Sequence, residues 1–142
     1  YEIKTQKLAG VEALVPRQHP RRGYMMPNSF VALAERTGMI EPLTIWVVTE
    51  ALRQAKVWKA QGINIPVAVN ISARNLLSPS FPENIQSLLS QFDLDGSAIT
   101  LELTESALLA DPLRAQTSLD KLHGLGIHLA IDDFGTGYSS LA

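Results

Sequence analysis

Short apolar segments rich in β-branched residues alternate in this sequence with longer segments of helical periodicity, and this alternation constrains the fold more than any other feature. The strand patterns cover residues 8–15, 66–71, 99–105 and 128–133. The helical patterns cover residues 29–37, 41–61, 82–92 and 112–125. Gly62 follows the longest helical pattern, and Gly124 and Gly126 are expected to stop the last one. Strands that alternate with helices form βαβ units, so the sequence predicts an α/β fold with a parallel sheet.

Each of the last three strand patterns carries a polar residue near its C-terminal end. Asn70, Glu102 and Asp132 are separated by 32 and 30 residues, about one βαβ unit each time. Side chains alternate along a strand, so Asn70 shares a face with Ala68 and lies opposite the valines that flank Ala68. The same parity sets Glu102 and Asp132 opposite their aliphatic neighbours. Each strand is therefore predicted to have an aliphatic face for helices and a small polar face with one oxygen ligand near its end.

These oxygen ligands are expected to meet, because parallel sheets bind ligands at the carboxyl ends of their strands. Glu12 in the first strand pattern is a fourth candidate, and Asp133 is a fifth. Hard oxygen ligands without cysteine suit Mg²⁺, Mn²⁺ or Ca²⁺ better than zinc. Two adjacent aspartates can serve two ions, and paired metal ions are the usual machinery for cleaving a phosphodiester.

Composition and charge exclude several other classes of protein. The chain has 142 residues, no cysteine and a formal net charge of −2. The absence of cysteine excludes a disulfide scaffold and a thiol nucleophile, and a basic excess for binding a nucleic-acid polymer is absent. No apolar stretch approaches the roughly 20 residues of a membrane span, and no signal peptide is recognisable at the first residues. We therefore expect no membrane contact from this segment and a cytoplasmic location, although another domain of the parent could be membrane-anchored.

Simpler interpretations exist for individual residues. A single Glu or Asp near a strand end is usually a cap or a solvated loop residue, and only the shared phase of four such residues favours a site. Asp133-Phe134-Gly135 spells the metal-binding tripeptide of kinases, but the other kinase segments are missing. Trp46 and Trp58 are expected to be core or packing residues.

Four segments, in order and spacing, resemble the EAL domains, which are bacterial phosphodiesterases of cyclic di-GMP. The first is Glu12-Ala13-Leu14, preceded by Gly10-Val11. The others are Asn70-Ile71-Ser72-Ala73-Arg74-Asn75-Leu76, Glu102-Leu103-Thr104-Glu105, and Asp132-Asp133-Phe134-Gly135-Thr136-Gly137. The resemblance runs through the whole chain, and it implies a modified TIM-like (β/α) barrel whose first strand runs antiparallel to the rest.

The resemblance also implies a site. One metal ion would be held by Glu12, Asn70, Glu102 and Asp132, and a second by Asp132 and Asp133, with Mg²⁺ or Mn²⁺ as the usual ions. Glu12, Asp132, Asp133 and Glu105 are the implied catalytic residues. Leu14 and Asn70 are implied to contact the substrate. A metal-held water would open the cyclic dinucleotide to linear pGpG.

Partners follow from the resemblance in the same way. Residues 134–141 and Glu105 resemble an element that couples substrate, metal and dimer contacts, which implies a homodimer through the loop after Asp133. Regulatory sensor or diguanylate cyclase domains are expected elsewhere in the parent protein.

Two departures from the family bear on activity. The family has an arginine that helps to bind the dinucleotide where this chain has Pro16, and Arg17 comes one residue later. A regular strand would point Arg17 to the opposite face, so weaker substrate binding is expected. A TIM barrel needs about 250 residues, and this chain supplies about half. We therefore expect residues 1–142 to be a partial EAL domain, truncated at both ends, with little activity alone.

A second function stays open on the sequence. Some EAL-like domains bind cyclic di-GMP or a protein without hydrolysis, and Pro16 and the short length favour such a non-catalytic receptor or protein-interaction module. The five intact candidate ligands favour the enzyme.

Overall fold

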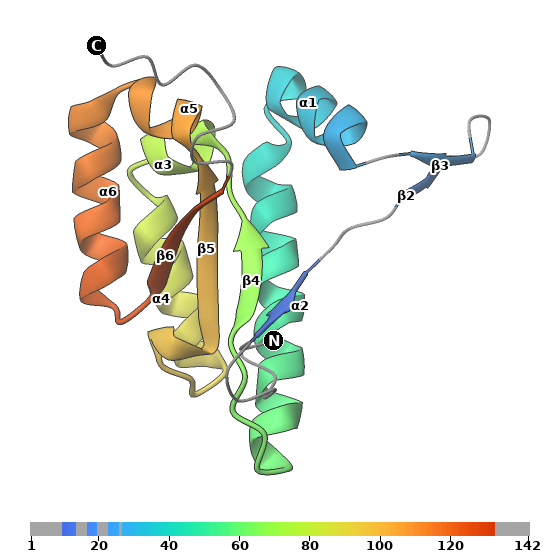
Figure 1. Ribbon diagram of the computed structural model, residues 1–142, viewed down its shortest axis with the longest axis vertical. Coiled ribbons are helices and arrows are strands. Elements are labelled where there is room, and N and C mark those ends of the chain that lie inside the picture. Colours follow the sequence, from blue (N-terminus) through green and yellow to red (C-terminus); the bar gives the residue numbers. More distant parts are fainter. Residues whose placement is uncertain (1–9, 14–16, 20–22, 26, 133–142) are drawn as a thin grey trace, which may run out of the picture.

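The core of the structure is a four-stranded sheet in which every pair of neighbouring strands is parallel (Figure 1). The structure is a computed structural model, and it describes residues 10–13, 17–19, 23–25 and 27–132. The strands, in spatial order, are β1 (Val11–Glu12), β4 (Val67–Asn70), β5 (Ile99–Thr104) and β6 (His128–Asp132). Parallel strands in chain order, each joined to the next through helices, form the parallel α/β sheet that the alternation of patterns predicted. They correspond to part of a (β/α) barrel, as the family resemblance implied.

The prediction of an antiparallel first strand is wrong. Val11 pairs with Val67 and Glu12 with Ala68 in a parallel register. The Val11 amide donates to the Pro66 carbonyl at 3.1 Å, and the Ala13 amide donates to the Ala68 carbonyl at 2.8 Å. The physical reason is the long helical crossover between β1 and β4, which returns the chain to the end of the sheet where β1 began.

A two-stranded antiparallel hairpin follows β1 and was not predicted. It pairs β2 (Arg17–His19) with β3 (Gly23–Met25). Figure 1 shows it projecting away from the main sheet before the first helix. Its strands are short and partly charged, so they lack the apolar alternation by which a strand is usually recognised.

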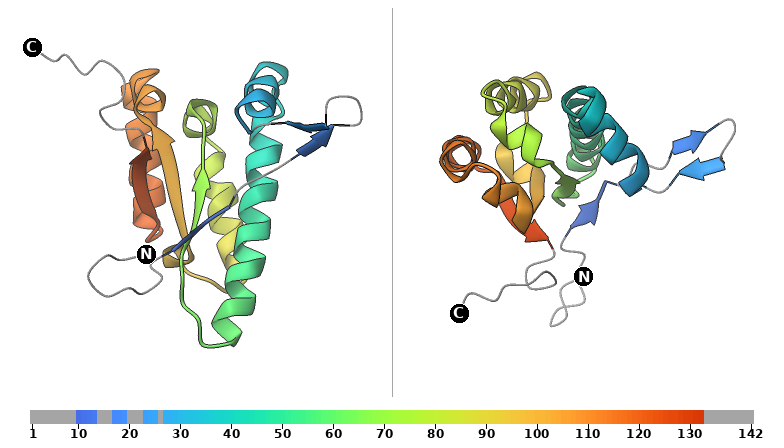
Figure 2. Two further views of the ribbon diagram at one scale, coloured as in Figure 1. Left: turned by 45° about the vertical axis from the view of Figure 1, so that its right-hand side comes forward. Right: turned by 90° about the horizontal axis from the view of Figure 1, so that it is seen from above.

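Helices cover one face of the sheet, as the view from above shows (Figure 2). The long ones are α1 (Pro27–Thr37), α2 (Ile40–Ala60), α4 (Phe81–Gln91) and α6 (Pro112–Gly124). Three short ones follow strand or helix ends: α3 (Ala73–Leu77), the 3₁₀ turn η1 (Gly96–Ala98) and α5 (Glu105–Leu109). Among the described residues, no helix is long and apolar enough to cross a lipid bilayer.

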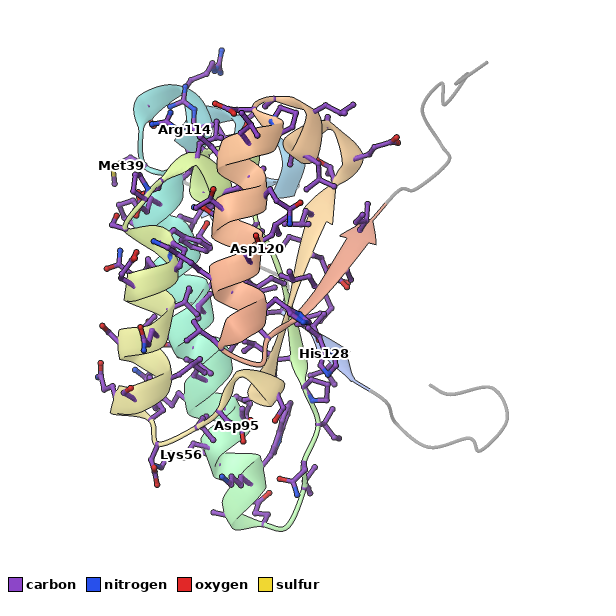
Figure 3. All side chains as sticks on the ribbon, turned by 90° about the vertical axis from the view of Figure 1, so that its left-hand side faces the viewer. Met39, Lys56, Asp95, Arg114, Asp120 and His128 are labelled. Carbon is purple, nitrogen blue, oxygen red and sulfur yellow. The ribbon has the colours of Figure 1, made fainter. Side chains whose placement is uncertain are left out.

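The alternating burial of the strands confirms the predicted faces in β4 and β5. Val67 and Val69 are buried, as are Ile99, Leu101 and Leu103. These side chains form the core with apolar residues of α2, α4 and α6, which lie side by side over them (Figure 3). The prediction fails in part at β6, where Ile131 is 44% exposed. Strand β6 is at the edge of the described sheet and has a neighbouring strand on one side only. Fewer residues therefore pack over the side chains near its C-terminal end.

Gly62 and Gly126 follow helix ends, as predicted, whereas Gly124, also predicted as a stop, is the last residue of α6. Gly62 and Gly126 have φ angles of +77° and +84°, a region that side chains with a Cβ rarely adopt. The helix before Gly62 ends at Ala60, and the one before Gly126 ends at Gly124. The chain can then reverse toward β4 and β6.

Gly96 is required for a steric reason, because its backbone lies against the turn that leads into β6 and leaves no room for a Cβ. A Cβ on Gly96 would lie 2.6 Å from Gly126 C and Ile127 N, and closer still to the Leu125 carbonyl oxygen. We expect Gly96→Ala to destabilise the fold by about 1–3 kcal/mol, the usual effect of overpacking. Urea unfolding measures this.

Gly124→Ala is the matched control for that substitution. A Cβ there meets nothing within 4 Å, and Gly124 lies in helix α6. We expect it to be neutral or to stabilise the helix by up to about 1 kcal/mol. Equal unfolding midpoints for the two variants would contradict the steric explanation.

Candidate functional site

The candidate site lies at the carboxyl edge of the parallel sheet, on the face that the helices do not cover. Asn70 pairs with Glu102 in the register of β4 and β5. Glu12 pairs with Ala68, which lies two residues before Asn70 on β4 and on the same face of the sheet. The predicted convergence of strand-end polar residues is therefore present in the backbone register.

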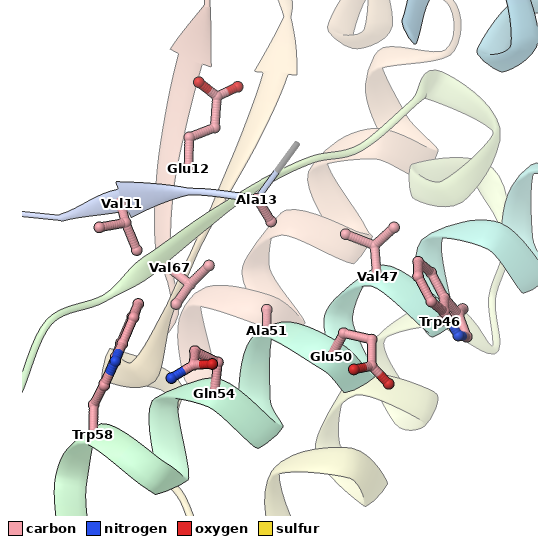
Figure 4. Close-up of a pocket in the computed structure, with 10 residues that line it drawn as sticks. All are labelled: Val11, Glu12, Ala13, Trp46, Val47, Glu50, Ala51, Gln54, Trp58 and Val67. Carbon is pink, nitrogen blue, oxygen red and sulfur yellow. The ribbon is translucent and has the colours of Figure 1, made fainter. Parts of the chain in front are cut away.

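Glu12 and Asn70 contact each other directly. Asn70 Nδ2 donates a hydrogen bond to Glu12 Oε1 at 2.8 Å. Figure 4 shows why Glu12 can take part: Val11 and Ala13 point toward α2, whereas Glu12 points away from that helix. The alternation of β1 therefore brings its carboxylate to the polar face, beside the Asn70 carboxamide.

Glu102 is held next to this pair. It is half-buried, and its carbonyl oxygen accepts the Ile71 amide at 2.9 Å, which ties the chain after Asn70 to β5. Asp132 is the last residue of β6 and pairs with Thr104, one pleat beyond Glu102 in the ladder. The four strand-end residues thus occupy adjacent rows of one sheet edge.

The other predicted site residues divide into two groups. Glu105, expected at the end of a strand, is instead the first residue of helix α5, directly after β5 at the same sheet edge. Leu14 and Asp133 lie outside the described residues, as does the loop 134–141 that we expected to form dimer contacts. Among the described residues, no three His, Asp or Glu side chains form a group able to hold a metal ion. The described part of the site is therefore a carboxylate–carboxamide pair beside a second carboxylate.

A polar cluster at the turn after Asn70 was not predicted from the sequence; Thr44 and Asn75 are buried there, and Ser72 is half-buried. The cluster consists of Thr44, Ser72 and Asn75, and the Asn75 side chain is its centre. The spacing of Ser72 and Asn75 just after a strand is a helix-capping pattern that could have indicated part of it.

A groove of about 310 Å³ lies on the opposite side of β1, between that strand and α2 (Figure 4). Trp46, Trp58, Val47 and Val11 line it. Trp46 was expected to be a core or packing residue; it is not in the core, since its side chain is 55% exposed. Trp58 is packed against the core, as predicted.

A parallel α/β sheet with helices on one face and carboxylate and carboxamide side chains at its carboxyl edge defines a class: barrel-type domains, which bind their ligands at that edge. The chain matches the EAL domain family over residues 1–142 and belongs to that family.

Relatives of known name agree with this assignment. A cyclic di-GMP phosphodiesterase of Pseudomonas aeruginosa is 40% identical over 98% of the chain, which covers 24% of that protein. The cyclic di-GMP phosphodiesterase PdeR of Escherichia coli is 40% identical over 96% of the chain, which covers 21% of that protein. The chain thus spans about a quarter of the length of these curated relatives.

A solved structure shows the same fold. The PaMucR phosphodiesterase in complex with cyclic di-GMP superposes with a TM-score of 0.85 at 38% sequence identity. The match covers 93% of this chain and 54% of that one.

Proposed function

We propose that this chain is part of a metal-dependent phosphodiesterase domain that hydrolyses cyclic di-GMP to linear pGpG. The observation that carries the proposal is the hydrogen bond of 2.8 Å between Asn70 and Glu12, with Glu102 in register beside them. These are the family's candidate ligands, drawn from three strands to one sheet edge. The names of the relatives, two phosphodiesterases and a cyclic di-GMP complex, support the substrate.

The donor chemistry of this edge fits Mg²⁺ or Mn²⁺. Asn70 Nδ2 lies against the Glu12 carboxylate, and rotation of the carboxamide would bring its oxygen to the same side, so both side chains can supply an oxygen to one small cation. In the proposal, Glu12, Asn70, Glu102 and Asp132 hold one ion, and Asp132 and Asp133 hold a second. Such ions supply activation of a water molecule for attack at phosphorus and neutralise charge on the phosphate.

The chain's own residues have further roles in the proposal. Glu105 begins α5 immediately after the strand that carries Glu102, so it can link occupation of the metal site to movement of that helix. Leu14 contributes to the binding of the nucleotide together with Asn70. Residues 134–141 contribute to a homodimer, and sensor or diguanylate cyclase domains of the full-length protein regulate the site.

The test is Mn²⁺-dependent hydrolysis of cyclic di-GMP by the full-length protein, with Pro16→Arg assayed beside it. Turnover by the unmodified protein, lost on chelation of the metal, is the expected result. Turnover only in Pro16→Arg would mean an intact metal site with weakened substrate binding. An arginine–phosphate contact is worth on the order of 10- to 100-fold in affinity.

Pro16 is the observation that favours a second function, a receptor that binds cyclic di-GMP without hydrolysing it. Nucleotide binding that needs no metal, with no turnover in either protein, would identify the receptor. An absence of nucleotide binding would instead identify a protein-interaction module.

A further inference from the structure

The Asn75 side chain is fully buried, and its oxygen collects hydrogen bonds from two separate segments. Asn75 Oδ1 accepts the Ser72 backbone amide at 2.9 Å and the Ser72 hydroxyl at 3.2 Å. It also accepts the Thr44 hydroxyl at 3.1 Å. Thr44 lies on α2 and is itself buried, so one oxygen joins this helix to the turn after β4.

The amide nitrogen of Asn75 indicates that the side-chain oxygen is the group for which an asparagine is needed here. Nδ2 is buried and has no hydrogen-bond partner among the described residues. A buried unpaired donor is destabilising, and an apolar side chain of similar size would avoid that penalty. Packing alone therefore does not explain an asparagine here, whereas the three bonds to its oxygen do.

One of those bonds holds the second residue after Asn70, and a separate backbone bond holds the first. The Ile71 amide is held by the Glu102 carbonyl, and the Ser72 amide is held by Asn75. Ser72 has extended backbone angles, φ −93° and ψ 165°, and helix α3 begins directly after it. Both amides after Asn70 are thus fixed, which sets the direction in which the chain leaves β4.

We infer that Asn75 is a positioning residue for Asn70: its oxygen holds the turn that keeps the Asn70 carboxamide against Glu12. The inference rests on the proposed function in one respect, that Asn70 is a metal ligand. Groups that orient a ligand are worth roughly 10- to 100-fold in metal affinity.

A purely structural role for Asn75 is distinguishable, because α3 has a second buried anchor. Ser118 Oγ on α6 donates to the Leu76 carbonyl at 2.5 Å. Ser118 is 6% exposed and bonds neither Ile71 nor Ser72. Ser118→Ala therefore loosens the same helix without releasing the turn.

The experiment compares Asn75→Ala, Thr44→Val, Thr44→Ser and Ser118→Ala in the full-length protein. Hydrogen exchange of the Ile71 and Ser72 amides is measured by mass spectrometry, and Mn²⁺ affinity is measured by calorimetry. We expect Asn75→Ala to speed exchange of both amides at least about tenfold and to weaken Mn²⁺ binding by about tenfold. Thr44→Val should shift both readouts in the same direction and to a smaller extent. Thr44→Ser and Ser118→Ala should stay within about twofold of the unmodified protein.

Thr44→Val preserves shape, so it gives an answer even if Asn75→Ala does not fold. Unchanged exchange in both variants would overturn the inference, as would a loss of Mn²⁺ affinity in Ser118→Ala as large as that in Asn75→Ala. An unmodified protein that binds no Mn²⁺ would refute the proposed function instead. In that case the exchange of the two amides still decides whether Asn75 holds the turn.

Discussion

Glu12→Gln is expected to lower kcat/KM for cyclic di-GMP by at least about 100-fold and to weaken Mn²⁺ binding. Partners that merely orient metal ligands are worth about 10- to 100-fold, so loss of a ligand charge should have a larger effect. Glutamine keeps the shape of the side chain and an oxygen that can accept from Asn70 Nδ2, which lies 2.8 Å from Glu12 Oε1. Steady-state kinetics over a range of Mn²⁺ concentrations provide the measurement.

Glu50→Gln is the matched control for that loss of charge. Glu50 lies on α2, and its exposed ion pair with Arg53 has an N–O distance of 2.8 Å. Exposed pairs of this kind contribute about 0–1 kcal/mol to stability, so we expect unchanged kinetics and nearly unchanged unfolding. Turnover by Glu12→Gln within about threefold of the unmodified protein would contradict the assignment of Glu12.

Leu122→Ala is expected to reduce the free energy of unfolding by about 2–5 kcal/mol. Leu122 lies on α6, is completely buried, and belongs to the core between the helices and the sheet. Removing its branched end leaves a cavity that close-packed neighbours fill only in part. Urea-induced unfolding, followed by tryptophan fluorescence, measures the change.

Leu113→Ala makes the same chemical change on the same helix, and Leu113 is 83% exposed. We expect it to alter stability by less than about 0.5 kcal/mol, as surface substitutions usually do. Similar midpoints for the two leucine variants would show that α6 does not pack against the sheet as described.

The parts of the fold that were predictable from the sequence are those set by local periodicity. Val67 and Val69 alternate with Ala68 and Asn70, and this period of two reproduces the burial of β4 in the structure. Direction and pairing are less local. The parallel direction of β1 depends on the crossover through α2, and the exposure of Ile131 depends on the position of β6 in the sheet. The alternation of apolar and polar residues within β1 or β6 therefore predicts neither the direction of β1 nor the exposure of Ile131.

The candidate site was predictable to the level of the sheet edge. Parity and spacing put Glu12, Asn70, Glu102 and Asp132 at one edge, and the register agrees. The sequence does not specify which side chains bond to each other. Thr44 and Asn75 are 31 residues apart and meet only because α2 lies against the turn after β4. Such a contact is a product of tertiary packing.

The bond between Glu12 and Asn70 joins residues that are 58 positions apart in the chain. An unfolded chain does not hold two such groups together, because closing a loop of that length loses conformational entropy. A ligand that needs both groups therefore binds only the folded form. At a free concentration 100 times its Kd, such a ligand adds about 2.7 kcal/mol to the free energy of unfolding. A ligand present well above its Kd would therefore hold a larger fraction of the protein in the folded form.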